Sequence, residues 1–498
     1  METSAGLTRR ITSWAAGFRP QDVPAQSAVT AKDCILDGMG VAATGASLPV
    51  GQVLFRYLDA EGWGSGGHTV IGSARKASAT WAAFVNGSTM HSEDWDDTPH
   101  TTYALAALLA TAEELDSSGE ELIAAWVIAY EVWVRMVTSM VMDRQTNPTS
   151  VVAPIVAALG CGYLRHFSAD QLAHAMGIAA SHSGGLRANF GTMAKPMDSG
   201  SSARAGVLSA QLAALGWTAE TEIFEGLEGV RYKGLFDTFA GPKQDRAKLV
   251  DRLGEFFSSA LVPADGNSAL DPETWPPRWR GQRRREATGQ PAVGRAGEGR
   301  GGPTVKAWPA CFGHDAALTA FFSLAGEPGF DRTAIESMVL YKPQEPTDSA
   351  TFRTVPQSGL EAKFSVPFVT AAAWLDGAIE LSTFRDASFE RIRRSGYIER
   401  VTVKIDPTMA ARGESAAVEA HMRDGSLRRF VLHGRGVGLR GQGVVEKFVG
   451  SSAPVLPEAS AREVAGRVKA LEREVHTREL IGELARDATP YGEERRTA

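Results

Sequence analysis

The sequence predicts a mostly α-helical protein: a large all-helical domain, a smaller α+β domain, and a C-terminal helix that packs back on the helical domain. Residues from about 27 to 260 carry apolar side chains at spacings of three and four, the period of amphipathic helices. After residue 304, short alternating apolar segments interleave with helical ones, and helical spacing returns at 458–487. This change of pattern indicates two domains.

The first domain is expected to be built from long, closely packed helices. A helix is predicted at 120–137, where one face carries Leu122, Trp126, Tyr130, Trp133 and Val137. Residues 104–109 follow the same spacing. Residues 151–164 are apolar nearly all round, which predicts a central buried helix, and small residues over 201–215 allow helices to approach closely.

Residues 263–303 interrupt the helical pattern with prolines, glycines and arginines and few aliphatic side chains. Such a composition cannot bury enough apolar surface to offset the entropy of ordering. We interpret the segment as a flexible linker or surface insertion. The expected organisation is therefore a helical domain over 1–262, an α+β domain over 304–445 that acts as a lid, and a helical return over 446–498.

Strands and helices alternate in the second domain. Strands are expected at 337–341 and 400–405, and a hairpin at 418–432, whose tight turn is formed by Asp424-Gly425. Helices are expected at about 313–325 and 362–381.

Composition excludes several classes of protein. The 498 residues include 43% hydrophobic and 22% charged residues, with a formal charge of −6, whereas nucleic-acid-binding proteins carry a basic excess. The three scattered cysteines, Cys34, Cys161 and Cys311, form neither a disulfide framework nor a zinc motif. The first residues lack an apolar run long enough for a signal peptide or a membrane span. We therefore expect a cytoplasmic protein without nucleic-acid or membrane partners.

The segment His91-Ser92-Glu93-Asp94-Trp95-Asp96-Asp97-Thr98-Pro99-His100 places four acidic residues and two histidines within ten positions. Carboxylate and imidazole groups that shift each other's pKa are typical of proton-transfer sites. The same groups also suit a metal site, and a solvated acidic loop is the third interpretation.

Four segments together resemble the MmgE/PrpD family, which includes 2-methylcitrate dehydratases, cis-aconitate decarboxylases and iminodisuccinate epimerases. They are NGSTMHSEDWDDT (86–98), FGTMAKP (190–196) with LGWTAETEIFEGLEG (215–229), KAWPACFGH (306–314), and LEAKFSVPFVTAAA (360–373). The resemblance implies a helical domain, an α+β lid and a homodimer. It also implies a site between the domains, without metal or other cofactor, that handles small di- and tricarboxylates.

Such substrates require cations that hold carboxylates and a group that moves protons. We assign Asp94, His100 and Lys195 as catalytic residues: His100 as the proton carrier because its ordinary pKa is near neutrality, Lys195 as the cation and Asp94 as the partner that orients His100. Candidate substrate-binding residues are Thr98, Asn147, His182, Arg204, Cys311 and His314. No residue is assigned to a metal.

Several of these residues also have structural interpretations. Asp96 and Asp97 are expected to hold the loop and to cap the helix that starts near Thr101. His91 is expected to hold the loop. His182 could equally be a core histidine, and Cys311 a small buried residue.

The chain departs from the family pattern at three places. A single residue, Pro99, separates Thr98 from His100, where family members have a longer link. Asn147 and Cys311 stand where family members carry histidines, and an asparagine cannot shuttle protons near neutral pH.

The expected function is a lyase that dehydrates or decarboxylates a small di- or tricarboxylate, in the manner of a 2-methylcitrate dehydratase or a cis-aconitate decarboxylase. Three alternatives stay open. One is an epimerase of a small dicarboxylate, which needs fewer acid-base groups. Another is a metal-dependent hydrolase or hydratase, and the last is a polycarboxylate-binding protein without catalysis.

Overall fold

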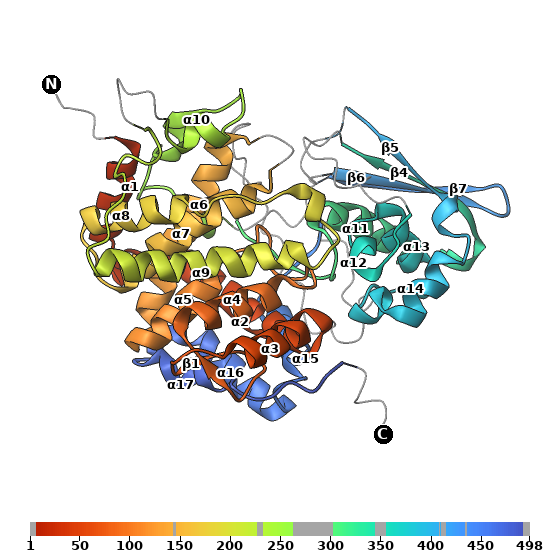
Figure 1. Cartoon of the computed structure of the whole chain (residues 1–498). Coiled ribbons are helices and arrows are strands. Elements are labelled where there is room, and N and C mark those ends of the chain that lie inside the picture. The colour runs from red at the N-terminus through yellow and green to blue at the C-terminus, as the bar shows by residue number, and fades with distance from the viewer. Residues whose placement is uncertain are drawn as a thin grey trace.

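The computed structural model describes residues 6–142, 146–226, 233–261, 302–343, 355–407, 409, 415–433 and 436–491. It confirms the predicted fold class: a helical body adjoins a smaller domain of helices and one four-stranded sheet (Figure 1). The predicted insertion at 263–303 lies almost entirely outside the described residues.

The helical body is formed by the first half of the chain. Its helices are α1 (Leu7–Gly17), α2 (Ala25–Ser47), α3 (Pro49–Glu61), α4 (Ala79–His91), α5 (Thr102–Leu115), α6 (Gly119–Met140), α7 (Pro148–Leu164), α8 (Ala169–Ala180), α9 (Ala194–Ala214) and α10 (Leu235–Phe239). The short strands β1 (His68–Thr69) and β2 (Lys76–Ala77) pair before α4. Apolar side chains of α5, α6 and α7 are almost fully buried, in agreement with their sequence patterns.

Local signals define where several helices begin. Ser118 and Glu121 form a capping box at α6, and Ser168 and Gln171 form another at α8. At α7, Pro148 occupies the first turn, where its missing N–H costs no hydrogen bond.

Two glycines allow α4 and α9 to touch, and this contact positions the site. A Cβ atom on Gly87 would lie 3.0 Å from the Cα of Gly200, and one on Gly200 would lie 2.2 Å from the carbonyl oxygen of Phe84. His91 follows Gly87 by about one helical turn, and Lys195 precedes Gly200 by little more. The crossing therefore brings the C-terminus of α4 and the N-terminus of α9 together.

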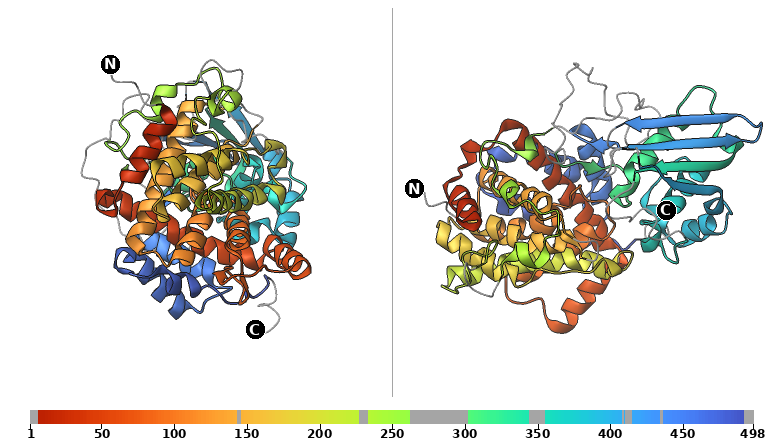
Figure 2. Two further views of the ribbon diagram at one scale, coloured as in Figure 1. Left: turned by 60° about the vertical axis from the view of Figure 1, so that its left-hand side comes forward. Right: turned by 90° about the horizontal axis from the view of Figure 1, so that it is seen from above.

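The second domain contains a four-stranded sheet in the order β5-β4-β6-β7. Its strands are β4 (Ile335–Lys342), β5 (Val401–Ile405), β6 (Ser415–Met422) and β7 (Leu427–His433). β4 and β5 run parallel through a crossover containing α12 (Gly359–Ala362), α13 (Val366–Asp376) and α14 (Asp386–Arg393), whereas β6 and β7 form the predicted hairpin. α11 (Asp315–Ala325) and α13 pack on the sheet, which lies at the end of the molecule far from α1 (Figure 2).

The C-terminal part returns to the helical body, as predicted. It contains α15 (Gln442–Ser452), α16 (Glu458–Lys469) and α17 (Thr477–Gly482), and α15 and α16 pack on α2 (Figure 1). α15 begins at Gln442, so the predicted boundary at 445 falls inside this helix. β3 (Val305–Lys306) lies before the α+β domain, and β8 (Gly438–Leu439) lies after it. The two strands pair antiparallel, so the two connections between the domains lie side by side.

Among the described residues, α6 is the one single helix long and apolar enough to cross a membrane, and 89% of its apolar window is buried inside the protein. The bent pair α2 and α3 passes the same test only if counted together, across a bend of 73°. A buried core helix satisfies this criterion equally well.

Candidate active site

The acidic-histidine segment forms the loop between α4 and α5, at the junction of the two domains. Thr98 pairs with Thr304, just before β3, through two backbone hydrogen bonds of 2.7 and 2.9 Å. Asp94 and His100 have backbone φ angles of +50° and +76°, a left-handed region that costs side-chain-bearing residues free energy. The loop is therefore held in a strained conformation that directs its side chains.

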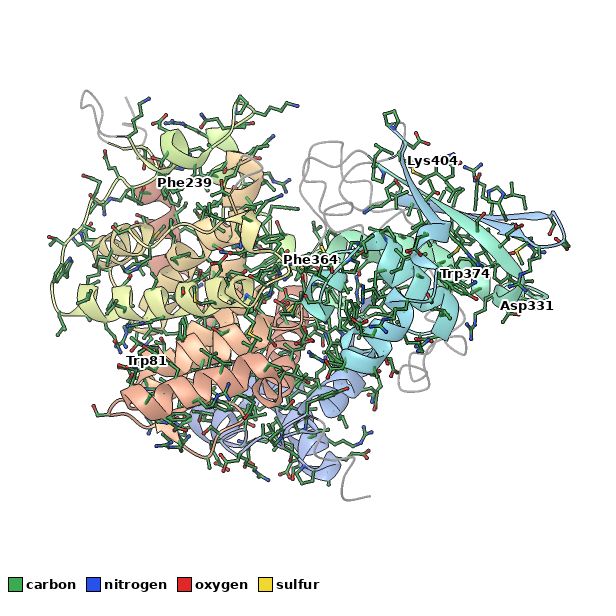
Figure 3. The ribbon with its side chains drawn as sticks, turned by 45° about the vertical axis from the view of Figure 1, so that its right-hand side comes forward. Trp81, Phe239, Asp331, Phe364, Trp374 and Lys404 are labelled. Carbon is green, nitrogen blue, oxygen red and sulfur yellow. The ribbon has the colours of Figure 1, made fainter. Side chains whose placement is uncertain are left out.

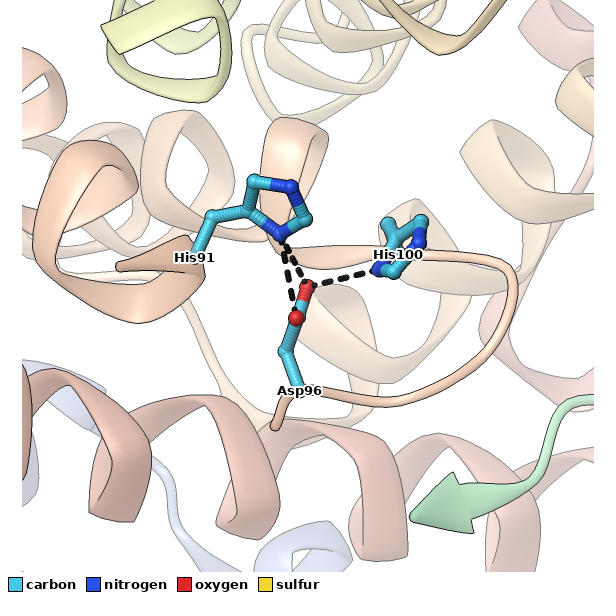
Figure 4. Close-up of side chains that lie close together, drawn as sticks. All are labelled: His91, Asp96 and His100. Atoms are coloured by element: carbon cyan, nitrogen blue, oxygen red, sulfur yellow. Dashed lines mark hydrogen bonds and ion pairs between the residues drawn. The ribbon is translucent and has the colours of Figure 1, made fainter. Parts of the chain in front are cut away.

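Asp96 lies at the centre of a buried hydrogen-bond network (Figure 4). Its carboxylate is 3.0 Å from Nδ1 of His91 and 3.1 Å from Nδ1 of His100, and it accepts a bond of 2.6 Å from the hydroxyl of Thr102. Burial opposes ionisation of Asp96, but the two histidines outweigh it and hold its pKa well below the ordinary range. Asp96 is therefore an anion that accepts from both imidazoles.

The contacts of His91 define its tautomer. Burial lowers the pKa of His91 to about 4, so the ring is neutral near pH 7. Because Nδ1 donates to Asp96, Nε2 carries the lone pair, and it lies 2.6 Å from Nζ of Lys195. His91 therefore links Asp96 to the ammonium group of Lys195.

Asp94 lies between two lysines. Its Oδ2 is 3.1 Å from Nζ of Lys195, and its Oδ1 is 2.6 Å from Nζ of Lys306, which comes from β3. Burial opposes ionisation of Asp94, yet Lys195 and Lys306 together hold its pKa well below the ordinary range. His100 approaches the same carboxylate with Nε2, 4.0 Å from Oδ1.

Lys195 retains donor capacity for a ligand. An ammonium group has three N–H donors, and among the described residues only His91 and Asp94 accept from it. The ammonium lies 5.2 Å from the ring centroids of both Phe190 and Phe364, and Phe364 is at the domain junction (Figure 3). The side chain of Lys195 is 7% exposed and that of His100 is 20% exposed. Both groups can therefore meet a small molecule at the junction.

Four fully buried lysines surround this loop, and we call them the lysine anchors: Lys306, Lys342, Lys363 and Lys447. Each donates to a backbone carbonyl group, namely those of Asp94, Gly313, Pro309 and Trp95, respectively. Lys447 also forms an ion pair of 2.6 Å with buried Asp37. The anchors come from β3, from β4, from the end of α12 and from α15, and they fix the backbone at 94–95 and 309–313.

Glu93 connects the helical body to the α+β domain. Its carboxylate is 3.1 Å from Nζ of Lys363 and 2.6 Å from the guanidinium group of Arg385. Burial opposes ionisation of Glu93, but these two cations lower its pKa, while burial lowers the pKa of Lys363 to about 8. The residue next to Asp94 is thus an ionic contact between the domains.

Comparison with known proteins identifies the family. Residues 9–244 match the sequence-family model of the MmgE/PrpD N-terminal domain. Residues 308–473 match the sequence-family model of the MmgE/PrpD C-terminal domain. The chain belongs to the MmgE/PrpD family. The two matched parts correspond to most of the helical body and to the α+β domain with the start of the helical return.

Curated relatives of this MmgE/PrpD chain are similar over part of their length. The human cis-aconitate decarboxylase is 31% identical over 214 residues, 39% of this chain and 43% of the relative. The cis-aconitate decarboxylase-like protein oryM of Aspergillus oryzae is 28% identical over 240 residues, 44% and 49% of the two chains. The cis-aconitate decarboxylase of Aspergillus terreus is 27% identical over 278 residues, 52% and 56%. The chain spans about half the length of the curated relatives it matches.

The three residues predicted to be catalytic in this MmgE/PrpD protein, Asp94, His100 and Lys195, lie together in the structure. The assigned orienting partner is corrected: Asp96, 3.1 Å from Nδ1 of His100, holds the ring, whereas Asp94 is 4.0 Å from Nε2. Thr98, predicted to bind substrate, has a buried hydroxyl group without a hydrogen-bond partner among the described residues. The structure therefore brings the three predicted side chains together at one place, and their catalytic role stays a prediction.

His314 and Cys311 are close to the anchors. His314 is fully buried, and burial, followed by the charge of Lys342, lowers its pKa to about 3, so it is neutral. Burial raises the pKa of the Cys311 thiol, and the backbone N–H of Cys311 donates to the carbonyl of Lys363. Both residues line the junction, and the raised pKa makes Cys311 a poor nucleophile.

The structure corrects the predictions for Arg204 and His182. Arg204 is exposed and stacks 4.5 Å above the ring of Trp81, on the outside of the helical body (Figure 3). It follows Lys195 by nine residues, about 900° of helical rotation, and therefore lies on the opposite face of α9. His182 is exposed in the turn after α8, and its side chain makes no hydrogen bond or ion pair with the described site residues.

Asn147 also has a role other than the predicted one. Its amide group donates 2.6 Å to Oγ of Ser150 and 3.1 Å to Oδ2 of Asp198, and it shares a hydrogen bond with the hydroxyl of Tyr103. Both amide protons are used inside the protein, so Asn147 positions its neighbours instead of donating to a substrate.

Sequence reasoning missed Lys306 and Asp198 and gave His91 and Asp96 structural roles. Asp198 follows Lys195 by three residues, a spacing that places both on one face of α9 and could have been recognised. Lys306 begins an apolar segment, KAWPA. A lysine in such a segment is seldom buried unless it has a partner, so the sequence could have indicated a buried ion pair. Asp97 holds the loop, as predicted, because it accepts bonds from the backbone N–H and the hydroxyl of Thr101. It does not cap α5, whose N-cap residue is Thr101.

The carboxylates do not converge on a metal position. Asp94 binds two lysines and Asp97 binds Thr101, so they face different partners. The ligand atoms of His91, Asp96 and His100 do lie within 4.8 Å of one another. In this arrangement, however, both Nδ1 atoms donate to Asp96, and a metal would need their lone pairs. The donor set therefore fits a proton relay better than a metal site.

Proposed function

We propose that this protein is a lyase that acts on a small di- or tricarboxylate by proton transfer at the carbon next to a carboxylate group, without a metal. The supporting observation is that Lys195 and His100 approach the same carboxylate: Nζ of Lys195 is 3.1 Å from Oδ2 of Asp94, and Nε2 of His100 is 4.0 Å from Oδ1. The cation would hold a substrate carboxylate, and His100 Nε2 would give or take the proton. The cis-aconitate decarboxylases among its relatives carry out chemistry of this class.

Dehydration, decarboxylation and epimerisation share one intermediate, a carbanion next to a carboxylate group. Removal of a proton generates it in dehydration and epimerisation, and departure of carbon dioxide generates it in decarboxylation. Lys195 would stabilise the negative charge on the carboxylate oxygens, in the manner of an oxyanion site. Asp96 would hold His100 with Nε2 directed at the substrate.

The test is incubation with 2-methylcitrate, cis-aconitate and iminodisuccinate in deuterated water, followed by proton NMR. We expect loss of water or of carbon dioxide from one of the first two. Lys195→Ala should reduce the rate about 10²–10³-fold, the range for removing one stabilising donor. Arg204→Ala removes an equal charge from the opposite face of α9 and should keep the wild-type rate. Full activity of Lys195→Ala would contradict the site assignment.

An epimerase is the second candidate, favoured by Asn147, which cannot move protons where family members carry a histidine. Deuterium incorporation into iminodisuccinate without net product would support it. Activity that is lost in EDTA and restored by Mg²⁺ would instead support the metal-dependent hydrolase. Melting stabilised by a tricarboxylate, without any product, would support a binding protein.

We also propose that the protein works as a cytoplasmic homodimer. The support is a group of exposed apolar side chains near the start of α9, formed by Leu186, Met193 and Met197, and three cysteines without disulfides. Sedimentation velocity should give a dimer for the wild type and a monomer for Met193→Glu/Met197→Glu. A monomeric wild type would contradict the proposal.

A further inference from the structure

Asp198 is a partly buried carboxylate close to Lys195, the cation that the proposed function assigns to a substrate carboxylate. It lies on α9 one turn after Lys195, and both residues point to the same side of the helix. Asp198 reaches the site through Asn147 and Tyr103, whose ring centroid is 4.9 Å from that of His91 and 6.4 Å from that of His100. A negative side chain at this position repels the carboxylates of a ligand, so it requires a partner of another kind.

The surroundings of Asp198 hold its carboxylate in one orientation. Asn147 Nδ2 and Ser150 Oγ each donate to Oδ2 at 3.1 Å. Gly185, with a φ of +117°, lets the backbone approach, because a Cβ atom there would lie 2.7 Å from Cβ of Ser150 and 3.1 Å from Oδ2 of Asp198. Only a glycine fits between these groups in that conformation.

These contacts fall on one oxygen of the carboxylate. Among the described residues, nothing donates to Oδ1 of Asp198, and the side chain is only partly buried. Burial raises the pKa of Asp198, whereas the hydrogen bonds from Asn147 and Ser150 lower it. Burial has the larger effect, so the carboxylate has fewer stabilising contacts than its negative charge requires. A donor that reached Oδ1 would complete the site.

We propose that Asp198 is a specificity-determining residue that accepts a hydrogen bond from a hydroxyl or ammonium group of the ligand. This inference rests on the proposed function and narrows it: the preferred ligand is a polycarboxylate that also carries a hydrogen-bond donor. Lys195 binds a carboxylate group of the ligand, and Asp198 accepts a hydrogen bond from its hydroxyl or ammonium group. Asn147 and Ser150 are positioning residues that hold Oδ2.

The test compares matched ligands by isothermal titration calorimetry on the full chain. Citrate and propane-1,2,3-tricarboxylate differ only by a hydroxyl group, and iminodisuccinate carries a protonated amine (NH2+) where oxydisuccinate has an ether oxygen. The wild type should bind the donor-bearing member of at least one pair about tenfold more tightly, as for a hydrogen bond to a charged acceptor. The pair that shows the preference identifies the donor as hydroxyl or ammonium.

Variants of Asp198 test the residue itself. Asp198→Ala should lose the preference and bind the ligand without a donor at least as tightly as the wild type, because the repulsive charge is gone. Asp198→Asn keeps the shape and an acceptor oxygen, so it should keep part of a hydroxyl preference and lose an ammonium preference. Asp170→Asn, which removes an exposed charge on α8, should retain the wild-type preference.

The inference is overturned if the wild type binds both members of each pair equally, or if the preference survives in Asp198→Ala. Absence of binding to all four ligands by the wild type would overturn the proposed function as well. Unchanged melting temperatures of the variants exclude misfolding as the cause of a lost preference, and Asp198→Asn serves the purpose if the alanine variant unfolds.

Discussion

Asp96 shows how one buried side chain can define the chemistry of several others. Its carboxylate accepts from His91, His100 and Thr102, and it therefore sets the tautomer of both imidazoles. With Nδ1 protonated in each ring, Nε2 of His91 accepts from Lys195, and Nε2 of His100 is left for the substrate. Asp96 is fully buried, and it determines which nitrogen of each neighbouring imidazole carries the proton.

Replacing Asp96 with asparagine tests this role. An amide N–H directed at either ring would favour the tautomer with Nε2–H, which cannot accept from Lys195. We expect kcat to fall about 10³–10⁴-fold, as when a triad carboxylate is replaced by its amide. Asp97→Asn is the matched control, because burial raises the pKa of Asp97 well above its ordinary value and the amide can still accept from Thr101. Similar kcat values for the two variants would contradict the role.

The buried His91 predicts a pH dependence of stability. Its pKa is about 4 in the folded protein and 6.5 ordinarily, so between these values the unfolded state binds the additional proton. The free energy of unfolding should therefore decrease as the pH falls from about 6.5 to 4, by about 3 kcal/mol from this group.

Denaturant unfolding at several pH values, for the wild type and His91→Gln, isolates this contribution. Burial raises the pKa of Asp37 to about 6 and that of Asp315 to about 8, which acts in the opposite direction, but in both proteins alike. The difference in free energy of unfolding between the wild type and His91→Gln should become smaller as the pH falls from about 6.5 to 4. A difference that does not change with pH would show that His91 is not a buried neutral base.

At the scale of elements, the crossing of α4 and α9 is the decisive contact. Gly87 and Gly200 allow the backbones to touch, and the crossing brings His91 to Lys195. The site thus depends on two residues that have no side chains to take part in chemistry.

Gly200→Ala should disrupt this crossing. The added methyl group would lie 2.1 Å from Oγ of Ser88 and 2.2 Å from the carbonyl oxygen of Phe84. We expect a loss of stability of at least about 1–3 kcal/mol, the usual cost of overpacking, together with reduced activity because Lys195 moves. Gly466→Ala, in α16 with nothing within 4 Å, should instead increase stability by up to about 1 kcal/mol. Equal melting temperatures for the two variants would contradict the close contact.

The sequence predicts elements well where the signal is local. α6 was expected at 120–137 and spans Gly119–Met140. The helix expected at 362–381 is shorter, because Ser365 caps α13 and Gly377 ends it in a left-handed conformation. Asp94, His100 and Lys195 were found because the acidic loop and the AKP segment stand out. Lys306 was missed because its partner lies 212 residues away, and such pairing follows only from the fold.

At the scale of the whole molecule, ionic contacts hold the two domains around the site. Glu93, in the loop of the helical body, pairs with Lys363 and Arg385 of the α+β domain. Because Glu93 adjoins Asp94, the same contact sets the distance between the domains and the position of a catalytic carboxylate.

Glu93→Gln should leave Lys363 and Arg385 as unpaired cations at the junction. We expect a loss of about 3–5 kcal/mol, as for breaking a buried ion pair. Lys363→Met introduced into that variant should restore part of the loss, which a double-mutant cycle by denaturant unfolding measures. Glu458→Gln, which breaks the exposed pair with Arg462, should cost less than about 1 kcal/mol. Additive effects of the two junction substitutions would show that Glu93 and Lys363 are not coupled.

The chemical labelling of the lysine anchors should report separation of the two domains in solution. Amine-acylating reagents react only with an unprotonated amine that meets solvent, and Lys306, Lys342, Lys363 and Lys447 are all enclosed. Exposed lysines should therefore be labelled within minutes, whereas the anchors acquire label only when the domains separate or the chain unfolds. Mass spectrometry of such labelling over time would follow the junction in solution, and a ligand that bridges the domains should slow it.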